Sequence, residues 1–329
     1  MKYVSCELAQ HGICFINDHI WSCCYSPVEG LEGAPESIVL IKKYKGEKID
    51  WDALFKLIDE RRENFKKGII PSSCQNCYWL KEQEWSDENY INQVYITHFE
   101  KCNANCFYCS GCQGRERDNK TKPYSVLPIL KDMQKRGIMP KGSEIHIGGG
   151  EPTLYHELDS IIKEYALTNY VNKILIPTSG IIFSKVIYEA LKKNMASIII
   201  SLDSGCRETY KKIKRVDKFN NIIKNISKYT KIEHPANVVL KYIIIPNFNS
   251  TKTEFDLFLK TIKKAGVKRI ALDIEAFYAK KFDYKVNPKL IDFVAWAEDY
   301  AKSQGFETET YMFYKHILSF KNAEATESI

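Results

Sequence analysis

The 329-residue sequence has no long hydrophobic run. No stretch approaches the roughly 18 consecutive apolar residues that mark a membrane-spanning helix. Its first residues, MKYVSCELAQHG, also lack the charged segment and apolar run of a secretory signal. These absences exclude the common membrane and secreted classes, and we therefore expect a cytoplasmic protein with no membrane partner.

A strong excess of one charge is missing as well. The 48 lysines and arginines exceed the 41 aspartates and glutamates by only seven, and the lysines are spread over most predicted helices. Nothing in this pattern requires a nucleic acid, and we do not expect one as a partner. The 44% of hydrophobic residues and 27% of charged residues describe a globular chain that can bury a large core.

Cysteine is what the sequence has in excess, with eleven residues. In a reducing compartment clustered cysteines bind metals or do chemistry more often than they form disulfides. The segment CNANCFYC places Cys102, Cys106 and Cys109 on one short loop. Thiolates suit zinc or an iron–sulfur cluster, and three of them would leave one iron of a four-iron cubane without a protein ligand. A zinc knuckle that uses Cys112 as fourth ligand remains an alternative.

Three later segments decide between these metals by resemblance: IHIGGGEPTL, IIISLDSG and VVLKYIIIPNFN. Together with the cysteine array and Tyr108 they resemble the radical S-adenosylmethionine (radical SAM) family over residues 91 to 275. The resemblance implies that Cys102, Cys106 and Cys109 hold a [4Fe-4S] cluster whose open iron binds S-adenosylmethionine. It also implies a flavodoxin- or ferredoxin-type electron donor.

From residue 91 short β-rich runs alternate with helical segments, the pattern of βαβ units and a parallel sheet. Six such repeats predict an α/β fold, a partial (β/α)6 TIM-type barrel over residues 91–285. A C-terminal helix and capping strand follow over 286–329. Active sites of such barrels lie at the C-terminal ends of the strands, where the cysteine loop, GGGEP, TSG and LDSG all fall.

The strand ends supply the candidate cofactor contacts. The resemblance implies that the glycine-rich segment lets the backbone approach the methionyl amine, since glycine has no side chain to obstruct it. The predicted cofactor-binding residues are Gly148, Gly149, Gly150, Glu151, Ser179, Ser201, Asp203 and Lys241. Cys206 is a candidate hydrogen-atom donor, and the alternative is a cysteine that only fills a loop.

Residues 1–90 hold six more cysteines. HGICFINDHIWSCC predicts a β-hairpin with a turn at Asn17 and Asp18, and residues 49–68 predict a helix that leads to a C-x2-C pair. This order resembles the SPASM or Twitch auxiliary-cluster modules of radical SAM enzymes, although those usually follow the barrel. It implies a second [4Fe-4S] cluster, and structural zinc is the alternative. Its predicted ligands are Cys6, Cys74, Cys77 and one of Cys23 and Cys24, whereas Cys14 is expected in the core.

The sequence thus predicts an oxidoreductase- or epimerase-type radical SAM enzyme. It would abstract hydrogen from a polar small molecule of carbohydrate or nucleotide-sugar type, leading to oxidation, epimerisation or rearrangement. The basic run 207–215 is either a phosphate clamp or a solvated helix face. A peptide-modifying maturase is an alternative substrate class, and a non-catalytic zinc-binding interaction module is an alternative of another kind.

Overall fold

A computed structural model describes residues 2–23, 39–71, 74, 77, 79–109, 123–275 and 288–310. It divides into two compact units. The N-terminal unit comprises residues 1–100, 119–150 and 155–174, and the C-terminal unit comprises 101–118, 151–154 and 175–329. The sequence predicts domain boundaries at residues 90 and 285, between the auxiliary-cluster module, the barrel and the C-terminal segment. These two boundaries remain predictions.

The N-terminal unit is built on two sheets. In the larger one the hairpin strands lie beside the first barrel strands, in the order β4 (Val39–Ile41), β3 (His19–Trp21), β2 (Gly12–Ile16), β6 (Gln93–Ile96) and β7 (Glu144–Ile147). β2 pairs with β3 in antiparallel and with β6 in parallel orientation. The smaller sheet pairs β1 (Lys2–Ser5) with β5 (Lys81–Glu84). The predicted hairpin, with its turn at Asn17 and Asp18, is confirmed.

Helices complete this unit. They are α1 (Glu7–His11), α2 (Trp51–Lys66), α3 (Leu127–Lys135), α4 (Leu158–Ile161) and the π-helical turn η5 (Ile162–Ala166). α2 begins where the Asp50 carboxylate accepts the Ala53 N–H, at 3.1 Å. Its buried residues recur at helical spacing and include two arginines, Arg61 and Arg62. Cys14 is fully buried, as predicted for a core residue.

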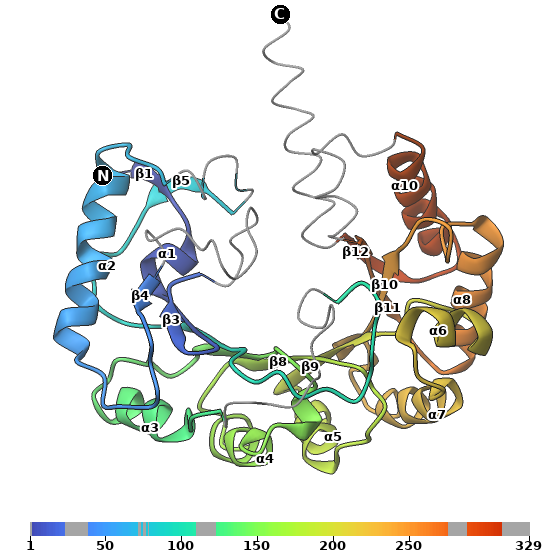
Figure 1. Ribbon diagram of the computed structural model, residues 1–329, viewed down its shortest axis with the longest axis horizontal. Helices are drawn as coiled ribbons and strands as arrows, with labels where there is room; N and C mark the ends of the chain where they lie inside the picture. The colour runs from blue at the N-terminus through green and yellow to red at the C-terminus, as the bar shows by residue number, and fades with distance from the viewer. Residues whose placement is uncertain are drawn as a thin grey trace, which may run out of the picture. The chain divides into compact units, whose positions relative to one another are not determined.

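The C-terminal unit carries the strands β8 (Lys173–Thr178), β9 (Ala196–Ser201), β10 (Val238–Ile244), β11 (Arg269–Ile274) and β12 (Glu307–Thr310), in that spatial order. β9 to β12 pair in parallel, and β10 and β11 are buried over nearly their whole length, as a sheet covered on both faces requires. Its helices are α5 (Lys185–Lys192), α6 (Arg207–Lys214), α7 (Phe219–Tyr229), α8 (Lys252–Lys264) and α10 (Pro288–Ser303), with the 3-10 turns η4 (Pro152–Leu154) and η6 (Pro235–Asn237). α5, α7 and α8 lie along one side of these strands (Figure 1).

The α/β class and all six predicted strands are confirmed, since β6 to β11 each precede a helix in the order of a partial (β/α)6 barrel. Between β9 and β10 the chain forms two helices, α6 and α7, because Arg215 adopts a left-handed conformation with φ +54° and ends the first. The predicted capping strand is β12, and the residues after it lie outside the described part of the chain. No described helix is long and apolar enough to cross a membrane.

Candidate active site

The cysteine loop of the C-terminal unit, residues 101–109, carries three half-buried thiols. Its backbone is tied to the end of α6. The N–H of Asn105 donates to the carbonyl of Lys214 at 3.0 Å, and the N–H of Phe107 donates to that of Ile213 at 3.2 Å. Carbonyls at a helix C-terminus have no partner within the helix, so the loop satisfies them. The loop is therefore anchored before any metal is considered.

A buried polar network beneath the loop strengthens this anchor. Lys214 exposes 3% of its side chain and pairs with Asp203, which exposes none. The Tyr108 hydroxyl donates to the Asp203 carboxylate at 2.6 Å and accepts from the Lys214 ammonium at 2.6 Å. The other oxygen of Asp203 accepts the Ile243 N–H at 2.8 Å. The network joins the cysteine loop, β10 and α6.

Burial and charge shift the pKa values in this region. Burial raises the pKa of the Tyr108 hydroxyl well above its usual range, and the Asp203 charge adds to the effect. Burial alone would lower the pKa of Lys214, but the neighbouring Asp203 charge outweighs it and the pKa is raised. Burial also raises the pKa of the Cys106 thiol. Lys214 is therefore a buried ammonium ion.

Glu151, in the GGGEP segment, is the second anchor of this unit. The residue is buried, with 1% of its surface exposed. One oxygen accepts from the Thr153 N–H at 3.1 Å and from the hydroxyls of Thr153 and Thr178 at 2.7 and 2.6 Å. The other accepts the Ser179 N–H at 2.7 Å. Glu151 thus fixes the end of β8, where the Ser179 hydroxyl reaches Asn103 of the cysteine loop at 2.8 Å.

Glu151→Gln is expected to destabilise the protein by about 1–3 kcal/mol, the usual cost of leaving a buried donor unsatisfied. Either orientation of the amide turns its NH2 group toward a backbone N–H, that of Ser179 or that of Thr153. Denaturant unfolding measures the loss. Glu189→Gln, at a half-exposed site on α5, is the matched control and should change stability little. Equal stability of the two variants would contradict this role of Glu151.

The glycine segment ends β7 in the N-terminal unit. Gly149 has φ +90°, and a Cβ there would lie 2.6 Å from the Phe99 carbonyl oxygen and 2.8 Å from that of Thr97. Any other residue would be strained and would push the backbone apart. Gly148 and Gly150 donate to the carbonyls of Ile96 and Phe99, at 3.0 and 2.7 Å. The absence of a side chain at Gly149 is thus required by the close backbone approach.

The remaining candidates lie within strands of the C-terminal unit or shortly after them. β9 ends at the half-buried Ser201, and Asp203 follows in a left-handed conformation with φ +59°, so strand alternation does not extend to it. Lys241 of β10 pairs with Asp273 of β11 at 2.8 Å. Cys206 lies at the start of α6, where its thiol contacts the Thr209 hydroxyl at 3.4 Å. Of the eight predicted cofactor contacts, Glu151 and Asp203 have carboxylates fully engaged within the protein.

The N-terminal unit gathers a second set of cysteines. Cys6 precedes α1, where its sulfur accepts the Ala9 N–H at 3.4 Å, and Cys23 and Cys74 pack against the same apolar cluster that contains Cys6. Cys74 and Cys77 adjoin in one turn, the Cys77 N–H donating to the Cys74 carbonyl at 3.1 Å. Cys24 and Cys112 lie outside the described residues.

The donor sets fit iron–sulfur chemistry. The described thiols are soft sulfur donors: three lie in the loop of the C-terminal unit and, apart from the core residue Cys14, four lie in the N-terminal unit. In the described part of the chain no three His, Cys, Asp or Glu side chains stand together as a site for a single metal ion.

Two buried basic residues escaped the sequence interpretation. Lys214 was part of the basic run 207–215, and the structure makes it neither a clamp nor a solvated side chain. Arg207 of the same run is paired with Asp217 at 2.6 Å. The burial of Lys214 could have been predicted from its spacing, because Lys214 lies on the same helix face as the apolar residues Tyr210 and Ile213. Arg61 similarly occupies a position on the buried face of α2.

Comparison with known proteins agrees with this geometry. Residues 96–255 match the model of the radical SAM superfamily. These residues form a radical SAM domain. The superfamily uses a [4Fe-4S] cluster and S-adenosylmethionine, so the predicted cofactors agree with the domain found.

Curated relatives of the radical SAM domain include the GTP 3',8-cyclase of Clostridium botulinum, 26% identical over 177 residues that span 53% of this chain and 53% of the relative. A probable GTP 3',8-cyclase of Pyrococcus abyssi is 28% identical over 48% of this chain and 49% of its own. The chain thus spans about half the length of the curated relatives it matches.

Among solved structures, Streptococcus suis SuiB bound to precursor peptide SuiA is similar with a TM-score of 0.51 and 14% identity, over 94% of this chain and 73% of that chain. SuiB bound to S-adenosylmethionine has a TM-score of 0.50 and 15% identity, over 84% of this chain and 56% of that chain. At such low identity the likeness establishes the fold, which is that of radical SAM proteins.

Proposed function

We propose that the chain is a radical SAM enzyme whose cluster is held by Cys102, Cys106 and Cys109. The observation that carries this proposal is the anchored loop, which presents three thiols and is tied to α6 and to the end of β8. When bound, the cluster supplies the electron for reductive cleavage of S-adenosylmethionine, which starts hydrogen abstraction from the substrate. A flavodoxin- or ferredoxin-type protein is the proposed electron donor.

The chain's own residues would prepare this chemistry by holding positions. The Lys214–Asp203–Tyr108 network fixes the loop from below, and Glu151 fixes Ser179, whose hydroxyl contacts Asn103. Preorganised groups need no rearrangement during the reaction. Glu151, Ser179, Ser201, Asp203 and Lys241 remain the proposed side-chain contacts of S-adenosylmethionine. Gly148, Gly149 and Gly150 are the proposed backbone contacts.

We propose a polar small molecule as substrate, of carbohydrate or nucleotide type, with oxidation, epimerisation or rearrangement as the outcome. GTP 3',8-cyclases, which the names of two relatives identify as acting on a nucleotide, support this class over about half of the chain. The exposed basic residues Lys211, Lys212 and Arg215 on and just after α6 offer charges for a phosphate. Cys206 remains the proposed hydrogen-atom donor if the reaction is an epimerisation.

A peptide is the second candidate substrate. The likeness to SuiB, a structure bound to its precursor peptide, extends over 94% of this chain and thus includes residues before the superfamily match. With a peptide as substrate, the N-terminal unit would help to bind it. We further propose that Cys6, Cys23, Cys74 and Cys77 hold an auxiliary [4Fe-4S] cluster there, which would accept electrons or support the substrate.

Anaerobic incubation of the reduced protein with S-adenosylmethionine tests the proposal. We expect 5′-deoxyadenosine and methionine as products, detected by chromatography and mass spectrometry, and a higher yield with the correct substrate class. Nucleotides, sugar nucleotides and peptides are added as candidate substrates in three separate incubations. Protein that contains zinc without iron, or iron-loaded protein that forms no 5′-deoxyadenosine in any arm, would overturn the enzyme assignment.

A further inference from the structure

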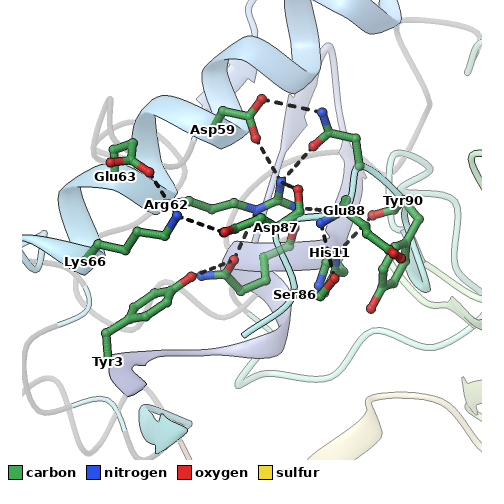
Figure 2. Close-up of polar contacts among 12 residues, drawn as sticks. Tyr3, His11, Asp59, Arg62, Glu63, Lys66, Ser86, Asp87, Glu88 and Tyr90 are labelled. Atoms are coloured by element: carbon green, nitrogen blue, oxygen red, sulfur yellow. Dashed lines mark hydrogen bonds and ion pairs between the residues drawn. The ribbon is translucent and has the colours of Figure 1, made fainter. Parts of the chain in front are cut away.

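Two consecutive arginines of α2, Arg61 and Arg62, are both buried, but only one has a complete set of acceptors. Arg62 exposes 2% of its surface. It donates to the carboxylate of Asp59 at 2.8 Å, and further acceptors come from Gln10 and from residues 87–89. Figure 2 shows Arg62 at the centre of these contacts. Its charge is therefore matched within the protein.

Arg61 has no such set. It exposes 9% of its surface and donates one hydrogen bond, to the Ser22 hydroxyl. Among the described residues no aspartate or glutamate pairs with it. The ionisable groups near its guanidinium include the thiols of Cys74, Cys23 and Cys6. Ser22 immediately precedes Cys23, so the hydrogen bond holds the guanidinium beside the cysteine group.

A buried guanidinium without a counter-charge is strongly destabilising, and native proteins pair such groups. Neutral thiols would not provide the charge. A metal-bound cysteine is a thiolate, and a centre with four thiolate ligands is an anion. Among the described residues, metal-bound cysteines are therefore the groups that could supply the negative charge that Arg61 lacks.

We propose that Arg61 is the counter-ion of an anionic metal–thiolate centre formed by Cys6, Cys23, Cys74 and Cys77, and that it raises the reduction potential of this centre. The inference rests on the auxiliary cluster proposed above and adds the residue that tunes it. One-electron reduction by dithionite adds one negative charge to the cluster. A fixed cation in a region of low dielectric constant stabilises that reduced state more than the oxidised state.

The test uses the full chain with Cys102, Cys106 and Cys109 all replaced by alanine, which leaves the auxiliary centre alone. In this background Arg61→Met is compared with Arg61→Lys and with Lys56→Met, which removes an exposed charge from the same helix. Iron and sulfide analysis and a redox titration followed by EPR are the measurements. We expect Arg61→Met to lower the equilibrium constant for one-electron reduction about tenfold or more, and each tenfold corresponds to a fall of about 59 mV in the reduction potential. The reduction potentials of Arg61→Lys and Lys56→Met should stay near that of the parent.

The outcomes separate the two proposals. If the parent triple variant binds no iron, or binds only zinc, the auxiliary cluster itself is refuted and the inference falls with it. If it binds about four irons and Arg61→Met has the parent's potential, the cluster stands and the role of Arg61 is refuted.

A second measurement covers the case in which Arg61→Met loads iron poorly. In the parent, removal of iron leaves the buried charge of Arg61 unpaired and so destabilises the protein. In Arg61→Met there is no such charge, so removal of iron destabilises the protein less. Thermal unfolding of both proteins with and without iron should therefore show a smaller iron-dependent change in Tm for Arg61→Met. An equal or larger change in the variant would refute the coupling between Arg61 and the centre.

Discussion

Cys106→Ala protein is expected to contain about half of the wild-type iron, about four of about eight atoms per chain, because two thiolates do not hold a cubane. 5′-Deoxyadenosine formation should fall to background in the same protein. Cys106 is the middle one of the three proposed ligands, and it lies between Asn105 and Phe107, whose backbone N–H groups bond to α6. Those bonds do not involve its side chain, so the fold should be kept. Iron analysis and chromatography of the incubated, reduced protein are the measurements.

Cys112→Ala is the matched control, because it also removes one cysteine near the loop. Full iron content and full 5′-deoxyadenosine formation are expected for it. Loss of metal in Cys112→Ala to the same degree as in Cys106→Ala would support the knuckle with four cysteine ligands instead. Full iron content in Cys106→Ala would show that the loop does not hold a cluster.

Lys214→Met is expected to destabilise the protein by about 3–5 kcal/mol, the usual result of removing one partner from a buried ion pair. The substitution leaves the fully buried Asp203 carboxylate without its cation. It also frees the Tyr108 hydroxyl and weakens the anchor of the cysteine loop. Denaturant unfolding measures the loss of stability, and the rate of iron release to a chelator measures the loosening of the loop.

Lys211→Met removes an exposed charge from the same helix and should change stability by less than about 0.5 kcal/mol. The double variant Lys214→Met/Asp203→Asn should recover part of the loss because it buries no unpaired charge. Asparagine also tolerates the left-handed conformation of residue 203, which has φ +59°. If the double variant is less stable than Lys214→Met alone, the ion pair is not the source of the loss.

The barrel strands could be predicted from the sequence because each is a short, nearly continuous apolar run between turn residues. β9 and β10 show this best, since their residues are buried on both faces of a parallel sheet. The break between α6 and α7 could not be predicted in the same way. No glycine or proline marks it, and the helix ends where the cysteine loop takes up its last carbonyls. That contact joins segments far apart in sequence.

The cluster and cofactor contacts inferred from the short motifs remain predictions. For Gly149 the structure gives a reason that the motif did not supply, the close approach of the Phe99 and Thr97 carbonyls. The partners of Glu151 and Asp203 could not be predicted either, because charge patterns do not reveal which ion pairs are buried. Lys214 lay in a basic run that looked solvated, and Arg61 lay in a charged helix beside Arg62. In both cases a cation on an apolar helix face was the overlooked sign.

The parallel pairing of β2 with β6 has a consequence for maturation. Gly12 lies opposite Gln93 and Phe15 opposite Ile96, so this pairing closes a long loop that contains Cys74 and Cys77. Closing long loops costs entropy and slows folding. The cysteines of the N-terminal unit are therefore expected to converge late, whereas Cys102, Cys106 and Cys109 share one short segment from the start. Iron should accordingly reach the N-terminal group last, and a chain produced with scarce iron should lack that centre first.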